Sequence, residues 1–192
     1  MNKFILIDRN KEMVDAWYEE FKNYANFEFY HGDIFDKSAD IVASPANSFG
    51  FMNGGIELAY SNRMGWHIQE EFQRRIQEEY DGEILVGQSC LIDTDFTQYP
   101  KILLAPTMRV PLYLNGTPNV YLSAKAIFLG VKRYSENASC VIPGLGTGTG
   151  YVPYKMCAQK MRMAYEDFYE NKKVFPSTLL RANINHMEEI TN

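Results

Sequence analysis

Apolar residues along the chain fall into two alternating patterns: short continuous runs, and longer stretches in which they recur every three or four residues. Residues 4–7, for example, are all apolar, and a run of this length is typical of a strand buried on both faces. In residues 11–24, apolar side chains such as Met13, Trp17 and Phe21 follow the period of a helix with one buried face. The chain is therefore expected to alternate strands with amphipathic helices.

These patterns predict strands and helices along most of the chain. Strands are predicted at residues 4–7, 27–31, 41–44, 88–93, 101–105 and 139–142. Helices are predicted at residues 11–24, 56–62, 66–80, 119–134 and 153–169. Because strands and helices alternate, we expect an α/β fold, namely a three-layer α/β/α sandwich with a mixed, mostly parallel sheet.

The length of 192 residues fits one domain with a buried core. Residues 1–170 carry the alternating pattern and are expected to form that single domain. Pro176 then interrupts the pattern. Residues 171–192 are therefore expected to be a C-terminal extension that includes a short helix near residues 177–190.

Composition and charge narrow the class of protein. The sequence is 46% hydrophobic and 22% charged, as in soluble globular proteins, and its net charge is -5 without a basic cluster. A broad nucleic-acid-binding surface is therefore not expected. No apolar run approaches the roughly 18 residues of a membrane span, and the N-terminal apolar run is too short for a signal peptide, so we expect a cytoplasmic protein.

The spacing of cysteines and histidines gives no indication of a metal site. The three cysteines, Cys90, Cys140 and Cys157, lie in predicted strands and a helix, and we expect reduced thiols in the core. The three histidines have no mutual spacing typical of metal ligands. The sequence therefore predicts no metal and no cofactor.

Two glycine-bearing loops each follow a predicted strand and precede a predicted helix. The first loop spans residues 43–57 and the second spans residues 143–151. Glycines at such junctions leave backbone N–H groups accessible, and the N-terminus of the following helix adds partial positive charge. This combination favours a bound phosphate, and two such loops on one small domain indicate a ligand with two phosphates.

Two familiar phosphate-binding motifs do not fit these loops. A Walker loop requires Gly-Lys-Ser or Gly-Lys-Thr at its end, and the sequence contains neither. A dinucleotide-binding G-x-G-x-x-G motif fails at its third glycine, because Thr149 or Tyr151 stands there in the two possible alignments.

Four motifs, in order, resemble those of the macrodomain family. Gly32-Asp33-Ile34 resembles the family's opening turn, and residues 44–48 (SPANS) resemble the motif at the end of its next buried strand. Residues 54–57 (GGIE) and 143–150 are similar to the family's first and second phosphate loops. The similarity extends over about residues 30–169.

The resemblance implies that the chain binds ADP-ribose. It implies that Asp33 accepts a hydrogen bond from the adenine amino group, that Ile34 packs on the ring, and that Asn47 holds hydroxyls of the distal ribose. The residues implied to donate amides to the phosphates are Gly54, Gly55 and Ile56 in one loop and Gly146, Thr147, Gly148, Thr149 and Gly150 in the other. Two alternatives remain open: Asp33 as a turn residue, and Asn47 as a partner of its own loop backbone.

Glu57 is the candidate catalytic residue, with Asn47 positioning the substrate. The resemblance implies a carboxylate beside the distal ribose, which would orient or deprotonate a water molecule for attack at the anomeric carbon or at an ester carbonyl. The alternative is an acidic residue that interacts with the dipole at a helix start. Phe51, Asn53 and Tyr151 are further candidates for contacts with this ribose, and partial core packing is the alternative for the two aromatic rings.

The leading hypothesis is an enzyme that hydrolyses ADP-ribose from a modified protein, a nucleic acid or a small ADP-ribose derivative. The second is a non-catalytic module that binds ADP-ribose or an NAD-derived metabolite, and the third is a nucleotide-binding protein unrelated to ADP-ribose. Arg109, in a loop bounded by prolines, is a candidate partner of a phosphate or carboxylate, with a surface role as the alternative. The acceptor linkage stays open at this point.

Overall fold

The computed structural model of the protein describes residues 1–191 and contains a six-stranded sheet in the order β2-β1-β6-β3-β5-β4. The strands are β1 (Lys3–Asp8), β2 (Phe27–His31), β3 (Ile41–Ser44), β4 (Cys90–Asp93), β5 (Lys101–Leu104) and β6 (Ser139–Ile142). β1 pairs in parallel with β2 and β6, and β3 does so with β5 and β6, whereas β4 runs antiparallel to β5. The mixed, mostly parallel sheet predicted from the sequence is confirmed.

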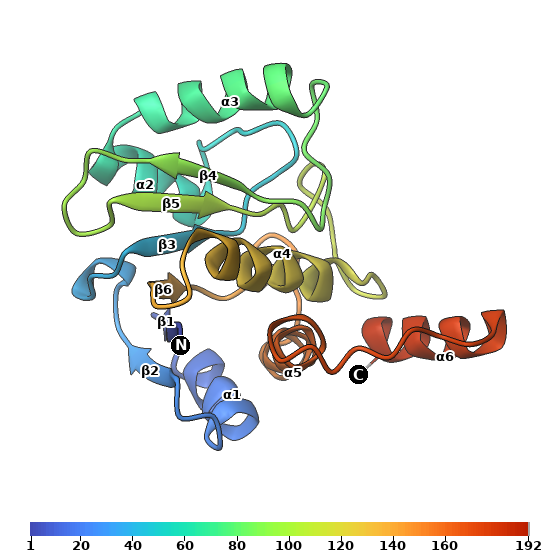
Figure 1. Cartoon of the computed structure of the whole chain (residues 1–192). Helices are drawn as coiled ribbons and strands as arrows, with labels where there is room; N and C mark the ends of the chain where they lie inside the picture. Colours follow the sequence, from blue (N-terminus) through green and yellow to red (C-terminus); the bar gives the residue numbers. More distant parts are fainter. Residues whose placement is uncertain (192) are drawn as a thin grey trace.

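Helices cover both faces of this sheet (Figure 1). The helices on one face are α1 (Lys11–Phe21), α4 (Asn119–Tyr134) and α5 (Tyr154–Ala164), and those on the other are α2 (Gly55–Met64) and α3 (His67–Glu79). Successive side chains of a strand point to opposite faces. In β1, Phe4 and Leu6 therefore join the core under α1, α4 and α5, while Ile5 and Ile7 join the core under α2 and α3. The predicted three-layer α/β/α architecture is confirmed.

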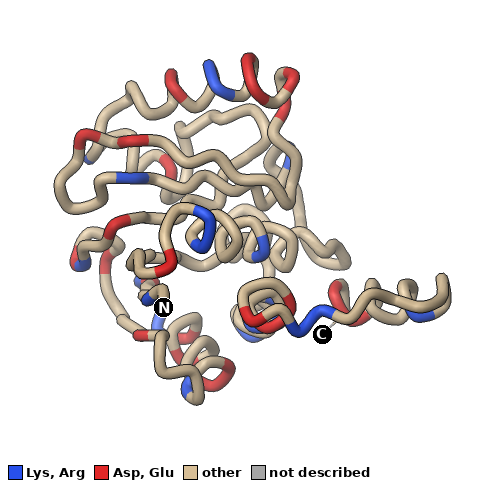
Figure 2. Tube along the Cα trace, viewed as in Figure 1, with Lys and Arg blue, Asp and Glu red and all other residues tan. Residues whose placement is uncertain are grey.

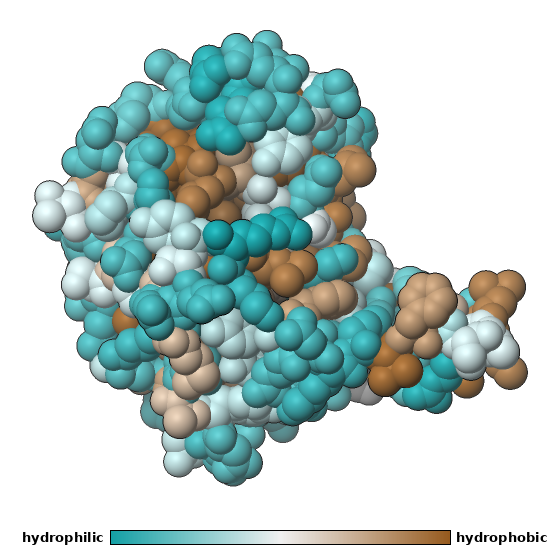
Figure 3. All heavy atoms as spheres, in the orientation of Figure 1, coloured by the Kyte–Doolittle hydropathy of each residue, from teal (hydrophilic) through white to brown (hydrophobic). Residues whose placement is uncertain are grey.

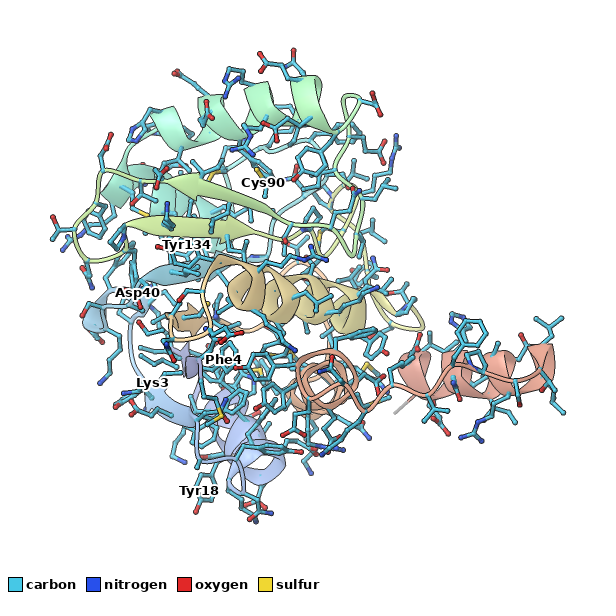
Figure 4. The ribbon with its side chains drawn as sticks, viewed as in Figure 1. Lys3, Phe4, Tyr18, Asp40, Cys90 and Tyr134 are labelled. Atoms are coloured by element: carbon cyan, nitrogen blue, oxygen red, sulfur yellow. The ribbon has the colours of Figure 1, made fainter. Side chains whose placement is uncertain are left out.

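Aromatic rings fill the core between the sheet and α1, α4 and α5. The ring of Phe4, which is labelled in Figure 4, has its centroid 5.1 Å from that of Phe27 and 5.1 Å from that of Phe128. The contact with Phe128 is edge-to-face, an arrangement that the quadrupoles of aromatic rings favour. The cysteines in the described part of the chain are free and buried, as predicted: Cys90, Cys140 and Cys157.

The helix predicted at residues 153–169 is not uniform. It runs as α5 to Ala164 and continues as one π-helical turn, η2 (Tyr165–Tyr169). Within this wider turn the ring of Tyr169 stacks on that of Tyr165, with centroids 4.9 Å apart. The π-helical turn coincides with the packing of these two rings. Apolar periodicity in the sequence does not indicate such a turn.

Charged residues of both signs are interspersed along the trace (Figure 2). On α3, for example, Arg74 pairs with Glu71 at 2.7 Å. Opposite charges therefore lie close together at this surface. Every helix of the described chain is too short or too polar to traverse a lipid bilayer.

The last helix, α6 (Leu179–Ile190), extends away from the sheet layers (Figure 1). At its start, the side-chain hydroxyl of Thr178 accepts a hydrogen bond from the amide of Arg181 at 3.1 Å. Near its end, Lys160 of α5 donates to the carbonyls of Glu188 and Thr191, both at 2.6 Å. α6 falls within the segment for which the sequence predicts a short helix, and none of its residues is buried.

Candidate functional site

The two glycine-bearing loops meet because the strands that precede them are neighbours. β3 and β6 pair in parallel, so the loops that leave their carboxyl ends emerge at the same edge of the sheet. Between the loops lies an open cavity of about 440 Å³, a size typical of small-molecule sites. Its lining residues come from the segments 7–9, 32–34, 45–59, 107–111 and 143–149.

The first loop presents uncapped amides at the start of α2. Gly54 precedes the helix without a side chain to cap it, and Gly55 has a φ of 56°, which favours glycine. A Cβ atom at either position would meet no other atom within 4 Å, so both glycines border open space. Among residues 1–191, no protein group accepts a hydrogen bond from the amides of Gly55 and Ile56. These amides remain available to an anion, which the helix dipole also favours.

The second loop folds tightly on itself. The amide of Val152 donates to the carbonyl of Gly146 at 3.1 Å, and the amide of Tyr151 donates to that of Gly148 at 2.9 Å. Within the described chain, the amides of residues 146–149 donate to no protein group. A Cβ atom at Gly148 would meet nothing within 4 Å. The loop therefore offers a second set of unpaired amides to the same cavity.

Asp33 lies between β2 and the short 3-10 helix η1 (Ile34–Asp36) and caps that helix. One carboxylate oxygen accepts a hydrogen bond from the amide of Phe35 at 2.9 Å, and the other accepts one from Nε of Arg9 at 2.8 Å. The hydrogen bond from Phe35 is the main cause of a lowered pKa at Asp33; burial opposes it, and the hydrogen bond from Arg9 lowers the pKa further. The side chain is therefore held ionised as a hydrogen-bond acceptor at the wall of the cavity.

Asn47 makes hydrogen bonds within its own loop. Its Nδ2 donates to the carbonyl of Phe51 at 2.6 Å, and its Oδ1 accepts from the amides of Phe49 and Phe51, each at 3.2 Å. The sequence left open whether Asn47 satisfies the local backbone, and these contacts show that it does. Since Asn47 also lines the cavity, its side chain fixes the shape of the first loop at the site.

Glu57 lies in the first turn of α2, with its carboxyl group buried in the wall of the cavity. Its Oε1 atom is buried and has no hydrogen-bond partner in the described chain. Burial raises the pKa of Glu57 from an ordinary 4.5 to about 8, and the nearby side chain of Asn47 offsets part of this shift. A carboxyl group that lines a cleft, with a raised pKa and one buried oxygen without a partner, is typical of a functional site.

Comparison with known proteins identifies the family. A model described as Macro domain matches residues 43–161, more than half of the chain. The chain belongs to the Macro domain family. An uncharacterized protein from Aquifex aeolicus is 31% identical over 131 residues, which cover 68% of this chain and 74% of the relative. The DNA ADP-ribosyl glycohydrolase of Mycobacterium tuberculosis is 27% identical over 140 residues, which cover 70% of this chain but 37% of that protein.

A solved macrodomain structure supports the same assignment. A mutant macrodomain of Oceanobacillus iheyensis with ADPR matches at a TM-score of 0.61 and 19% identity, covering 74% of this chain and 77% of that chain. At this level of identity the likeness shows the fold. The macrodomain resemblance inferred from four sequence motifs is therefore confirmed.

The macrodomain pocket brings together most of the residues proposed from the sequence. Those that line it are Asp33, Ile34, Asn47, Asn53, Gly54, Gly55, Ile56, Glu57, Gly146, Thr147, Gly148 and Thr149. Gly150 and Tyr151 are not among the lining residues. Gly150 is buried, and a Cβ atom there would lie 2.5 Å from the carbonyl oxygen of Gly146, so this glycine closes the loop. Contacts of all these residues with a ligand stay predictions.

The three remaining candidates of the sequence lie in different surroundings. Phe51 lines the pocket and is 53% exposed. Tyr151 is 64% exposed, and the centroid of its ring lies 5.0 Å from that of Tyr113. Arg109 lies outside the pocket lining and pairs with Glu83 at 2.8 Å. The surface role for Arg109 is therefore the one that its contacts support.

Sequence reasoning missed several pocket residues, among them Asp8, Arg9, Thr107 and Met108. Asp8 ends β1, and Thr107 and Met108 come soon after the end of β5. The carboxyl ends of parallel strands share one edge of the sheet, so residues just after each strand can reach the pocket. The sequence does not indicate which strands are neighbours, so it gave no reason to select these positions.

Proposed function

We propose that the pocket binds ADP-ribose. The two sets of unpaired amides suit the two phosphates of its diphosphate, and the ionised side chain of Asp33 suits the adenine amino group as a hydrogen-bond acceptor. The comparisons support this assignment, since the Oceanobacillus iheyensis macrodomain is described with ADPR and the Mycobacterium tuberculosis relative is named for ADP-ribosyl hydrolysis.

We further propose that the macrodomain hydrolyses the bond between ADP-ribose and an acceptor on a protein, a nucleic acid or a small molecule. In the proposed step, the ionised form of Glu57, which is the minor form at neutral pH because its pKa is about 8, takes a proton from a water molecule, and the water oxygen bonds to the anomeric carbon of the distal ribose. The bond from that carbon to the acceptor breaks. Its electron pair leaves with the acceptor, which takes up a proton from solvent. Asn47 holds the first loop in the shape that positions this ribose.

One observation carries the catalytic proposal: the buried, unpaired Oε1 of Glu57 in the wall of the cavity that the glycine loops border. A buried polar atom without a partner costs about 1–3 kcal/mol. A helix-start residue that only interacted with the dipole would be more stable with its carboxylate in solvent. The placement of Glu57 therefore supports a role toward a bound molecule.

A second candidate function is a binding module without turnover. The observation that favours it is the pKa of Glu57, which burial raises to about 8. At neutral pH the carboxyl group would then be largely protonated, and a protonated carboxyl group donates a hydrogen bond but does not act as a base. In this alternative Glu57 donates to a hydroxyl of the ribose.

The binding proposal is tested by calorimetry with ADP-ribose, AMP and NAD. We expect saturable binding of ADP-ribose and much weaker binding of AMP, because AMP lacks the second phosphate and the distal ribose. Equal binding of AMP and ADP-ribose would contradict the proposal and favour a general nucleotide site.

Hydrolysis is tested with a panel of defined ADP-ribose linkages: N-glycosidic, O-glycosidic, ester and phosphate. We expect release of ADP-ribose from at least one linkage by the wild type, and a loss of at least about 100-fold in rate for Glu57→Gln, the usual scale for a general base. Glu136→Gln is the matched control, because Glu136 is exposed and lies outside the pocket lining. A wild type that binds ADP-ribose but cleaves no linkage would establish the binding module.

A further inference from the structure

The segment from residue 174 to residue 190, hereafter the C-terminal arm, exposes many apolar side chains. Figure 3 shows hydrophobic residues on this projecting part of the molecule. Phe175 is 89% exposed and Leu179 is 78% exposed. The other exposed large apolar residues of the arm are Val174, Leu180, Ile184 and Met187. So many exposed apolar side chains on one short segment are unusual for a surface that faces only water.

The arm is fixed to the domain mainly at its C-terminal end. Lys160 holds the carbonyls of Glu188 and Thr191 there, while the N-terminal half of α6 projects outward (Figure 1, Figure 4). α6 has 12 residues, and a lone helix of this length is marginally stable in water. Since none of its residues is buried, packing within this chain contributes little to its stability. A partner that covers the apolar face would supply the packing that stabilises this helix.

The apolar and charged residues of α6 are spaced nearly evenly on either side of Ile184. At about 100° per residue, Leu180, Ile184 and Met187 lie on one stripe of α6, and Arg181 and Glu188 both lie on the same flank of that stripe. Ile184 is near the middle of this set. The positively charged residue therefore lies toward one end of the helix and the negatively charged residue toward the other, at nearly equal distances from Ile184.

We propose that α6 pairs with α6 of a second copy of the chain, antiparallel, about a two-fold axis beside Ile184. In this register Leu180 packs on Met187 of the second copy, and Ile184 packs on its equivalent. Arg181 faces Glu188 of the second copy, and by symmetry this pair occurs twice. Both side chains are exposed and line a groove between α6 and residues 172–177.

The charge pattern favours a second copy over an unrelated partner. An antiparallel pair brings each positive end against a negative end, so one sequence satisfies both sides of an isologous contact. A parallel pair would place Arg181 and Glu188 of the two copies on opposite sides of the seam, so neither ion pair could form, which disfavours it. No residue of the arm lines the proposed ADP-ribose pocket, so the residues that pair are not those that would hold the ligand.

The test is the mass of the chain in solution by sedimentation equilibrium. We expect a reversible dimer of twice 22.2 kDa. Ile184→Glu should abolish it by placing two carboxylates at the axis. Leu85→Glu is the control, because Leu85 is 56% exposed but lies off the arm. The melting temperature of each variant shows whether the domain is still folded, as we expect since α6 buries none of its residues.

Charge reversal tests the antiparallel register. Arg181→Glu should weaken the dimer by about tenfold, since two attractive pairs become repulsive. The double variant with Glu188→Arg should restore it. A wild type that stays monomeric overturns the proposal. This holds also if the arm of the monomer binds lipid vesicles or an unrelated peptide instead. A dimer that survives Ile184→Glu, or one that the double variant does not restore, overturns it as well.

Discussion

Replacing Glu57 by glutamine should change how the stability of the macrodomain depends on pH. The pKa of Glu57 is about 8 in the folded chain and an ordinary 4.5 when the chain is unfolded. Between these two values the folded state holds one proton more than the unfolded state. Stability falls with rising pH wherever the folded state binds more protons, so Glu57 lowers the free energy of unfolding throughout this window.

The magnitude follows from the pKa shift. Each pH unit inside the window contributes about 1.4 kcal/mol, so raising the pH by about two units, from roughly 5.5 to 7.5, costs the wild type about 2–3 kcal/mol through Glu57 alone. A glutamine side chain at this position carries no titrating proton and keeps nearly the same shape. The free energy of unfolding of Glu57→Gln, minus that of the wild type, should therefore grow by about that amount over the same interval.

Urea denaturation of the wild type, Glu57→Gln and Glu136→Gln at both pH values measures this difference. Glu136 is exposed, so its glutamine variant should track the wild type to within about 0.5 kcal/mol. If the difference between Glu57→Gln and the wild type is the same at both pH values, then Glu57 titrates normally. That result would refute the inference that the buried carboxyl group is protonated at neutral pH.

Substitutions in the loops and beside the arm should separate ligand binding from stability. Gly148→Val should weaken ADP-ribose binding by at least about tenfold in calorimetry with little change in melting temperature, because its side chain enters open space in the pocket. Gly150→Ala should instead lower the free energy of unfolding by about 1–3 kcal/mol in urea denaturation, because its Cβ meets a carbonyl oxygen. Asp33→Ala should cost about 1 kcal/mol of stability by the same method through the lost cap, and should weaken binding of ADP-ribose but not of ribose 5-phosphate. Lys160→Met should speed amide hydrogen exchange in α6 but not in the sheet, since it releases only the C-terminal end of that helix.

Local patterns were sufficient to predict the fold class and the two glycine loops that border the pocket. Apolar periodicity depends on which face of an element is buried. In β1, for example, Phe4 packs into the core on one face of the sheet and Ile5 packs into the core on the other. The glycine loops were recognisable because a strand, a side-chain-poor turn and a helix start are contiguous in sequence. The resemblance to macrodomains used the same contiguous motifs.

What the sequence did not reveal depends on pairing between distant segments. Arg9 contacts Asp33 only because β1 and β2 are adjacent and parallel, so that the ends of both strands meet. The placement of Gly150 outside the pocket depends on a contact with Gly146 that the loop makes by turning back on itself. Neither contact leaves a periodic signal in the sequence.

At Glu57 we expect the requirements of stability and of the proposed function to differ. In the buried wall of the cavity, a glutamine would avoid the cost of ionisation above about pH 5 and would fill nearly the same volume. Proteins depart from the most stable choice mainly at functional sites. A buried carboxyl oxygen without a partner, beside amides that are also without partners in the described chain, is what a bound ligand that supplied the missing contacts would require. The stability that Glu57→Gln gains and the binding or turnover that it loses should therefore appear in the same variant.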